Sequence, residues 1–220
     1  MQRPRDGFSR AGFAVWEKVR AWSDPAFRFL WELEVAGQVP DAPFVVAANH
    51  FSHLDPVIVG KALGPVRYLA VDEIYGQTEW FDKLITGFGA IPLSRVSVQL
   101  SALRTADSYL RMGGAVGIFP EGKRVWTWGE VAPKRGAAWL ALRTGVPLVP
   151  LAIWGTQDAF GKGARRIERR PVRLEIGEPL LPKNYPGHPL EASKPMIEDW
   201  RSWMSGAMDR LRDEAIAAQL

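Results

Sequence analysis

Apolar residues recur along this chain with two spacings, one typical of strands and the other of helices. Short apolar runs predict strands over residues 44–48, 66–71, 88–93, 115–119, 147–153 and 172–177, and an alternating pattern predicts another over 29–35. Helical spacing predicts helices over residues 56–63, 78–86, 97–111, 135–144 and 190–217. Because strands and helices alternate, the sequence predicts an α/β fold with a mixed, largely parallel central sheet flanked by helices.

The N-terminal part of the chain has a pattern of its own. Residues 8–22 form an apolar stripe at helical spacing, which runs from Phe8 to Trp22, with basic residues elsewhere on the helix. Such a helix either packs on the core or lies in a membrane interface with its aromatic rings among the lipid headgroups. We therefore divide the chain into an N-terminal amphipathic membrane-association element, residues 1–28, and one domain over residues 29–220.

Composition narrows the chemistry. The chain has no cysteine, which excludes disulfides, a thiol nucleophile and cysteine-based metal sites. The net charge of +4 suits anionic lipid, a phosphorylated substrate or nucleic acid, and part of it lies in a glycine-rich loop predicted over residues 155–170. No uncharged apolar run approaches the roughly 18 to 20 residues of a spanning helix, so we expect a soluble or peripheral protein.

The candidate base is a histidine that follows the apolar strand 44–48. His50 and Asp55 stand five positions apart in a strand-to-helix turn, where their side chains can meet, and sites in open α/β sheets lie at such strand ends. A neutral imidazole can take a proton from an attacking hydroxyl, and a nearby carboxylate can fix its tautomer. Two structural alternatives remain, because Asp55 also suits a helix N-cap and His50 a hydrogen-bonded core histidine. A metal site with His53 is disfavoured because the third histidine of the chain is distant.

Two further strand ends carry arginines. The run from Gly117 to Arg124 nearly matches a phosphate-binding loop of the form G-x4-G-K-[ST]. We reject that reading because Arg124 replaces the metal-binding hydroxyl and Glu121 adds a negative charge where a phosphate would lie. The run from Gly87 to Arg95 is a second short apolar segment that ends in arginine. If the three strand ends converge, they place a base beside an anion site, although a lone cation is more often a solvated surface charge.

Together these segments resemble the glycerolipid acyltransferase family, in its lysophosphatidic acid acyltransferase (PlsC-like) group. Its motif blocks occur in order: Asn49-His50-x4-Asp55-Pro56 for the HX4D block, Gly89–Arg95 for the second, Phe119-Pro120-Glu121-Gly122-x-Arg124 for the FPEGTRS block, Lys134–Ala138 for the FKRGAA stretch and Val146–Leu151 for the VPIVPV-type block. The likeness spans about residues 29–180. The four blocks, together with the FKRGAA stretch between the third and the fourth, occur in order at plausible spacing, which makes the likeness specific.

The resemblance implies roles for individual residues. His50 is expected to be the general base and Asp55 its partner, in the transfer of an acyl chain from acyl-CoA or acyl carrier protein to 1-acyl-glycerol 3-phosphate. The residues expected to bind the acceptor and its phosphate are Arg95, Glu121, Gly122, Arg124 and Lys134. No cofactor or metal is implied. The expected location is peripheral, on the cytoplasmic face of a membrane, in phospholipid biosynthesis.

Departures from the family pattern leave the acceptor open. Lys123 replaces the usual threonine, Val125 replaces serine, and Trp126 and Trp128 stand where the family has polar residues. This tryptophan pair could line an acyl groove, insert into lipid or only pack. Glycerol 3-phosphate, another lysophospholipid or a glycolipid are alternative acceptors, and a non-catalytic lipid-binding protein is a rival reading. A nucleic-acid-binding role and a serine hydrolase fit poorly, because the aromatics do not interleave with a basic face and no G-x-S-x-G follows a strand.

Overall fold

The structure is a computed structural model that describes residues 25, 29–71, 91–93 and 100–218. Its strands form a seven-stranded sheet in the order β1-β7-β6-β2-β5-β3-β4. The strands are β1 (Glu34–Ala36), β2 (Phe44–Ala48), β3 (Val66–Val71), β4 (Ile91–Leu93), β5 (Ala115–Ile118), β6 (Leu148–Trp154) and β7 (Arg173–Ile176). The predicted amphipathic segment 8–22 and the predicted helix 78–86 lie outside the described residues.

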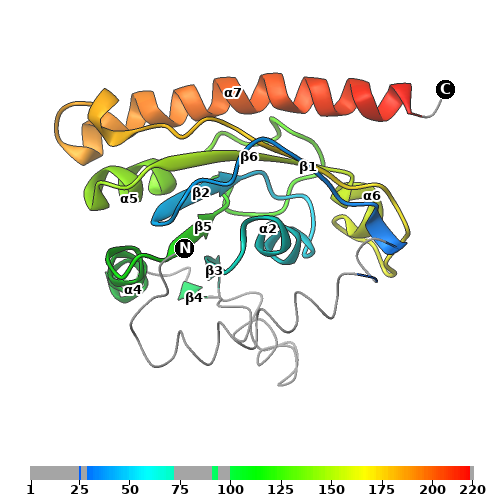
Figure 1. Ribbon diagram of the computed structural model, residues 1–220, viewed down its shortest axis with the longest axis horizontal. Coiled ribbons are helices and arrows are strands. Elements are labelled where there is room, and N and C mark those ends of the chain that lie inside the picture. The colour runs from blue at the N-terminus through cyan, green and yellow to red at the C-terminus, as the bar shows by residue number, and fades with distance from the viewer. Residues whose placement is uncertain (1–24, 26–28, 72–90, 94–99, 219–220) are drawn as a thin grey trace.

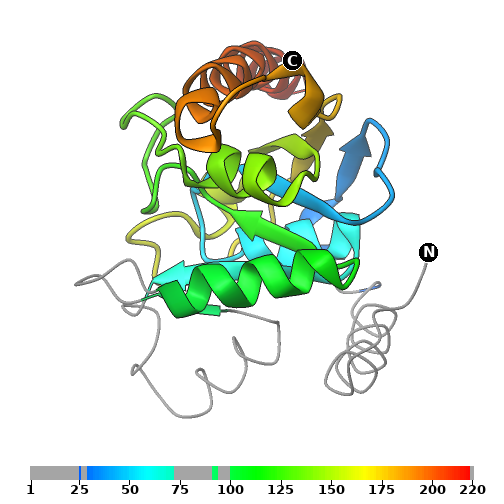
Figure 2. The same cartoon turned by 90° about the vertical axis from the view of Figure 1, so that its left-hand side faces the viewer.

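The helices cover both faces of this sheet (Figures 1 and 2). They are α2 (Asp55–Leu63), α4 (Leu100–Arg111), α5 (Gly136–Thr144), α6 (Thr156–Phe160) and α7 (Pro189–Ala217), with a short 3-10 turn η2 (Pro182–Asn184). In Figure 1 the long α7 runs across the top of the molecule and packs, together with α5, on one face of the sheet, whereas α2 lies below the sheet. None of the described helices combines the length and the apolar character that crossing a bilayer requires.

The sheet is largely parallel, as the sequence predicts. Strand β2 pairs in parallel with both β5 and β6, and β3 pairs in parallel with β5 and β4. Among the seven described strands, only β6 and β7 pair in an antiparallel manner, and β1 then runs parallel to β7. The carboxyl ends of β2, β5 and β6 therefore meet at the same edge of the sheet, which is where α/β folds place their sites.

Strand β2 lies in the middle of the sheet and is buried on both faces. Its side chains alternate between two cores: Val45 packs with residues of α5 and α7, whereas Val46 packs with residues of α2. A run of consecutive apolar residues is the pattern that a parallel strand covered on both faces requires. The indole Nε1 of Trp200 on α7 also donates to the carbonyl oxygen of Ala47, at 2.9 Å.

Two local predictions are wrong. The alternating segment 29–35 is not one strand, because Phe29–Trp31 is helical and β1 begins only at Glu34. Glu32 between them has a φ of 39°, a left-handed conformation that interrupts an extended chain. The predicted loop 155–170 contains the one-and-a-half-turn helix α6, whose five residues are too few to show a period of their own.

Candidate active site

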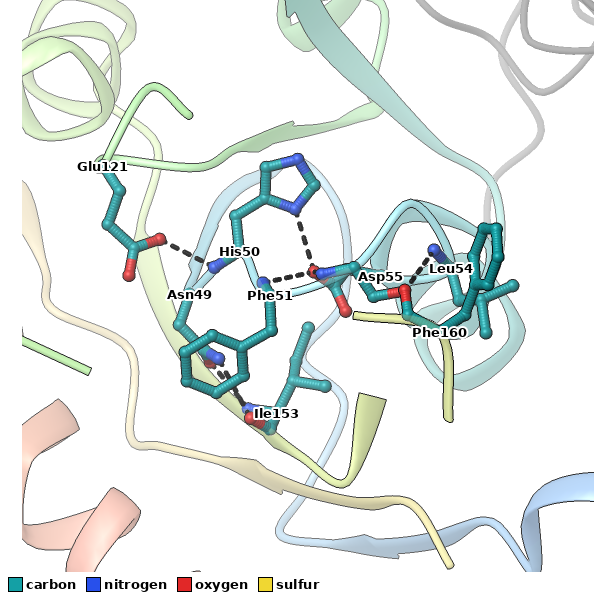
Figure 3. A network of polar contacts seen from close by, with 9 residues as sticks. Asn49, His50, Phe51, Leu54, Asp55, Glu121, Ile153 and Phe160 are labelled. Carbon is teal, nitrogen blue, oxygen red and sulfur yellow. Dashed lines mark hydrogen bonds and ion pairs between the residues drawn. The ribbon is translucent and has the colours of Figure 1, made fainter. Parts of the chain in front are cut away.

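The turn that follows β2 brings His50 and Asp55 into contact. Nδ1 of His50 lies 2.8 Å from Oδ2 of Asp55, which is completely buried at the start of α2 (Figure 3). The same carboxylate oxygen accepts the backbone N–H groups of Phe51 at 2.8 Å and Ser52 at 2.7 Å. Asp55 thus holds the imidazole and closes the backbone of the turn around it. Asp55 is not the N-cap of the helix, because α2 begins at Asp55 and Leu54 holds the cap position.

Two buried polar side chains fasten this turn to β6 and to the segment beyond it. Asn49 donates from Nδ2 to the carbonyl oxygen of Ile153 at 2.9 Å and accepts the N–H of Ile153 at 2.8 Å (Figure 3). Ser52 donates from Oγ to the carbonyl oxygen of Phe160 at 2.6 Å and accepts the N–H of Leu54 at 3.0 Å. Because both side chains are fully buried, the turn is anchored on two sides before any substrate binds.

Glu121 meets the turn from the carboxyl end of β5. Its Oε2 accepts the backbone N–H of His50 at 2.7 Å, and its Oε1 is buried with no hydrogen-bond partner among the described residues. Burial raises the pKa of Glu121 to about 8, against the lowering effect of the bond from the His50 N–H. At neutral pH the carboxyl group is mainly protonated, so it can present an O–H to a substrate oxygen.

Aromatic rings fix the plane of the imidazole. The ring of Phe119 stacks on His50, with 4.0 Å between ring centroids and 12° between planes, and Tyr68 stacks on the other side of Phe119 at 5.3 Å. Tyr68 pairs in register with Gly117, where any Cβ would come within 2.3 Å of the tyrosine ring. Only glycine at 117 therefore lets the tyrosine ring cross β5 and reach the stack. The buried Tyr68 hydroxyl has no hydrogen-bond partner in the part of the chain that the structure describes, and burial raises its pKa well above the usual value.

The arrangement suits general-base chemistry. When Nδ1–H of His50 donates to Asp55, the lone pair of Nε2 is free to take a proton. The ring edge carrying Nε2 points away from Asp55 in Figure 3, and the histidine side chain keeps 10% of its surface exposed. Among the described residues, no group of three or more histidine or carboxylate side chains is placed to hold a metal ion.

The predicted cations surround this centre at different depths. Arg124 is half-buried, and burial lowers its pKa while the charge of Asp55 opposes that shift. Burial, and then the charge of Arg124, lowers the pKa of His53 to about 4, so this histidine is neutral at pH 7. Lys134 is exposed, and its Nζ lies against Gly122, where a Cβ would come within 2.7 Å of it. Arg95 lies outside the described residues.

Sequence reasoning did not find every residue of the site. The sequence places Tyr68 in a predicted strand and Phe119 at the start of the FPEGTRS block, but it does not predict their stack on His50, which depends on the register between β3 and β5. Glu121 was expected to shape the acceptor site, but its bond to the His50 backbone was not foreseen. Phe160 contributes only its carbonyl oxygen, for which the side-chain sequence gives no signal.

Comparisons with known proteins agree with this geometry. Residues 32–154 match the protein family described as "Acyltransferase". The chain is 33% identical over 142 residues to the 1-acyl-sn-glycerol-3-phosphate acyltransferase of Bacillus subtilis, a match that covers 64% of this chain and 68% of that protein. A probable 1-acyl-sn-glycerol-3-phosphate acyltransferase of Mycoplasma pneumoniae is 31% identical over 147 residues, which cover 63% of this chain and only 54% of that protein.

A solved structure has the same fold. The crystal structure of the 1-acyl-sn-glycerophosphate acyltransferase PlsC from Thermotoga maritima superposes with a TM-score of 0.70 at 25% sequence identity. The superposition covers 93% of this chain and 84% of that chain. The likeness therefore includes the sheet and the helices on both of its faces.

Proposed function

The chain belongs to the acyltransferase family, and we propose that it moves a fatty acyl chain from a thioester donor to the free hydroxyl of 1-acyl-glycerol 3-phosphate in phospholipid biosynthesis. The observation that carries this proposal is the contact of 2.8 Å between His50 and the buried Asp55, at the carboxyl end of the central strand. The Bacillus subtilis relative is named as a 1-acyl-sn-glycerol-3-phosphate acyltransferase and the Mycoplasma pneumoniae relative as a probable one, and both names support the choice of acceptor.

The proposed reaction uses His50 as the general base. Nε2 takes the proton of the acceptor hydroxyl while its oxygen attacks the thioester carbonyl carbon. The tetrahedral intermediate collapses as the carbon–sulfur bond breaks, and the imidazolium returns the proton to the departing thiolate. The products are an ester and a free thiol. Asp55 stabilises the imidazolium and holds its tautomer throughout, because its carboxylate stays in place through two backbone N–H groups.

The proposed acceptor site lies beside His50, on the loop that follows β5. Glu121 offers its Oε1, which has no hydrogen-bond partner among the described residues, to an acceptor oxygen, and the neighbouring Gly122 lets Nζ of Lys134 lie close to the backbone. Arg124 and Lys134 supply positive charge for the phosphate, and we assign the same role to Arg95 from its place in the second motif block. Half-burial favours Arg124 over Lys134 as the stronger ligand, since screening by water weakens an exposed charge.

We also propose an acyl donor, a membrane anchor and a cellular location for this protein. The donor is acyl-CoA or acyl carrier protein, and the reaction as written requires neither a metal nor a cofactor. Residues 1–28 form a peripheral membrane anchor, and residues 29–220 form the acyltransferase domain on the cytoplasmic face. The apolar stripe of residues 8–22 supports the anchor.

A second acceptor remains a candidate because of one loop. Lys123 and Trp126, which depart from the family pattern, come two and five residues after Glu121 in the loop that follows β5. Another phosphorylated or glycosylated lipid acceptor would use the same base and the same donor. A screen of acceptors at a fixed donor concentration separates these possibilities.

The test of the proposal is thiol release from acyl-CoA by purified protein, with and without lysophosphatidate. We expect release that depends on the acceptor, and a His50→Ala variant should lower turnover by roughly two to four orders of magnitude. His188→Ala is the matched control, because this exposed histidine caps α7 at a distance from the site.

Three outcomes decide between the readings. If the wild-type protein is active and the His50→Ala variant keeps nearly the same turnover, the assignment of His50 as the base is wrong. Release only with acyl carrier protein identifies the donor. No release with either donor and any of several lysolipids contradicts the enzymatic proposal and favours a non-catalytic lipid-binding protein.

A further inference from the structure

The two tryptophans of the loop after β5 have opposite environments. Trp128 is packed inward, because its Nε1 donates to Oγ of Ser205 at 3.1 Å and its ring meets Trp200 edge-on at 5.7 Å. Trp126, two residues earlier, keeps 59% of its surface exposed. Packing therefore accounts for one member of the pair and leaves the other without a role in the core.

Several contacts hold the Trp126 indole at the surface. The backbone N–H of Trp126 donates to Oε2 of Glu130 at 2.7 Å, which fixes the loop at this residue. Nζ of Lys162 lies 5.3 Å from the centre of the indole ring, a cation–π geometry. A Cβ on Gly163 would lie 3.3 Å from the far edge of the indole, so glycine there lets the ring lie close to the backbone. The exposed ring thus has a defined position.

The segment that supplies Lys162 is strongly basic. Residues 160–170 contain five cations, Lys162, Arg165, Arg166, Arg169 and Arg170, and one anion, Glu168, which gives the segment a net charge of +4. The whole chain also has a net charge of +4, so all other residues together are neutral. Glu168 pairs with Arg166 at 3.5 Å and Arg170 at 2.9 Å, but such exposed pairs are weak and leave most of the positive potential at the surface.

Both segments are bonded directly to the catalytic turn. Next to Trp126, the N–H of Val125 donates to the carbonyl oxygen of His50 at 2.8 Å. Two residues before Lys162, the carbonyl oxygen of Phe160 accepts Oγ–H of Ser52 at 2.6 Å. The exposed indole and the basic segment therefore adjoin the candidate active site and are fixed to it.

We propose that Trp126, Lys162, Arg165 and Arg166, here called the indole–lysine surface, dock this protein on an anionic lipid bilayer. Indole rings favour the headgroup region of a membrane, and clustered lysines and arginines are attracted by anionic headgroups. The inference rests on the proposed function, in which the acceptor is itself a membrane lipid. Because both of its segments are bonded to the turn that carries His50, docking presents the candidate site to the bilayer in one orientation.

The lack of native cysteine permits a direct test in the full chain. A Trp126→Cys variant labelled with an environment-sensitive dye should show a blue shift on phosphatidylglycerol-containing vesicles and little shift on phosphatidylcholine alone. Ile216→Cys, an equally exposed position at 54% near the end of α7, is the matched control and should show no shift. In unlabelled protein, Lys162→Gln with Arg165→Gln should lower the vesicle partition coefficient roughly fivefold for each cation removed.

An activity assay separates docking from substrate binding and from the proposed function itself. The double variant Lys162→Gln with Arg165→Gln should lower turnover several-fold with acceptor embedded in vesicles. It should leave turnover unchanged with a short-chain acceptor below its critical micelle concentration. Equal losses with both acceptors would assign the surface to a substrate phosphate site and overturn the proposal. A chain that sediments with anionic vesicles while the dye at position 126 shows no shift would also overturn it. If the wild-type chain turns over neither acceptor, the proposed function fails while the dye shift still decides the docking proposal.

Discussion

The catalytic turn and the loop beside it are built in opposite ways. In the turn, Asn49 and Asp55 are fully buried, and each makes two or more hydrogen bonds with other parts of the chain or with the backbone around it. In the loop that follows β5, Lys123 and Lys134 are exposed, and Trp126 projects from the surface. Burial and hydrogen bonding therefore fix the base, whereas the cations around it remain partly in water.

This difference explains where the chain departs from its family. A change in the turn leaves buried polar groups without partners, which costs about 1–3 kcal/mol for each group. A change of an exposed residue in the loop usually alters stability by less than about 0.5 kcal/mol. The replacements Lys123 and Trp126 fall in the loop, and the turn keeps every residue of its motif. We infer that the chemistry is held constant by the turn while the loop can be adapted to a particular acceptor or surface.

Replacement of Asp55 tests the turn most severely. Asp55→Asn removes the charge that faces His50 and favours the wrong imidazole tautomer, so we expect kcat to fall by about a hundredfold or more. Asp107→Asn is the control, because Asp107 lies in an exposed pair with Arg111 on α4. Steady-state kinetics at saturating acceptor measures the effect. A loss of less than about threefold in Asp55→Asn would mean that the carboxylate only shapes the backbone.

Glu121 links the two regions, because it lies in the loop after β5 and bonds to the backbone of the turn. The pH dependence of the protein's stability tests the ionisation state of this residue. Its pKa of about 8 in the folded protein lies above its ordinary value of 4.5, so the folded state binds more protons than the unfolded state between these values. Stability should therefore fall as pH rises through this window, at up to about 1.4 kcal/mol per pH unit. His53, with a folded pKa of about 4, has the opposite effect, but only below its ordinary value of 6.5.

The useful comparison is consequently between pH 6.5 and 8. Between these two pH values the free energy of unfolding should fall in the wild type by about 2 kcal/mol more than in Glu121→Gln. Denaturant titration at each pH measures the difference. The glutamine keeps an acceptor for the His50 N–H and a donor for substrate, so turnover should change by only a few-fold. Parallel pH curves for the two proteins would show that Glu121 is ionised in the folded state.

Removing the charge of Arg124 in the loop should have the smallest effect on the kinetics, and it should change KM rather than kcat. Arg124→Gln is expected to raise the KM for a phosphorylated acceptor about tenfold, with little change in kcat or in the KM for the donor, since a half-buried cation contributes mainly to binding. Lys123→Gln is the neighbouring control, because Lys123 is exposed and lies 3.7 Å from Glu130. A drop in kcat for Arg124→Gln with an unchanged KM would place this arginine at the reacting atoms instead.

Periodicity was sufficient to predict the sheet and most of its helices. The buried strand 44–48 and the helix after it follow from their apolar spacing, and parallel pairing then brings the strand ends together. The convergence of His50, Asp55 and Glu121 could be foreseen for this reason. The strand predicted over 29–35 failed because alternation in a short segment does not exclude a turn at Glu32.

Other features depend on contacts that no sequence pattern reports. The stack of Tyr68 and Phe119 on His50 requires a particular register between β3 and β5 and the absence of a side chain at Gly117. The separation of Trp126 from Trp128 depends on which ring reaches α7, and both are simply tryptophans in one loop until the loop is folded. The amphipathic segment 8–22 and the role of Arg95 remain predictions.

The hydrogen bond from Trp200 on α7 to Ala47 on β2 has a consequence for biosynthesis. The two residues are 153 positions apart, and α7 follows all strands of the described sheet along the chain. A nascent polypeptide can therefore expose every strand from the ribosome while the strand that leads to His50 is covered on one face by α5 but not yet by α7. We expect ribosome-bound chains that end before α7 to be sensitive to protease, and chaperones to act on the sheet until this helix is synthesised.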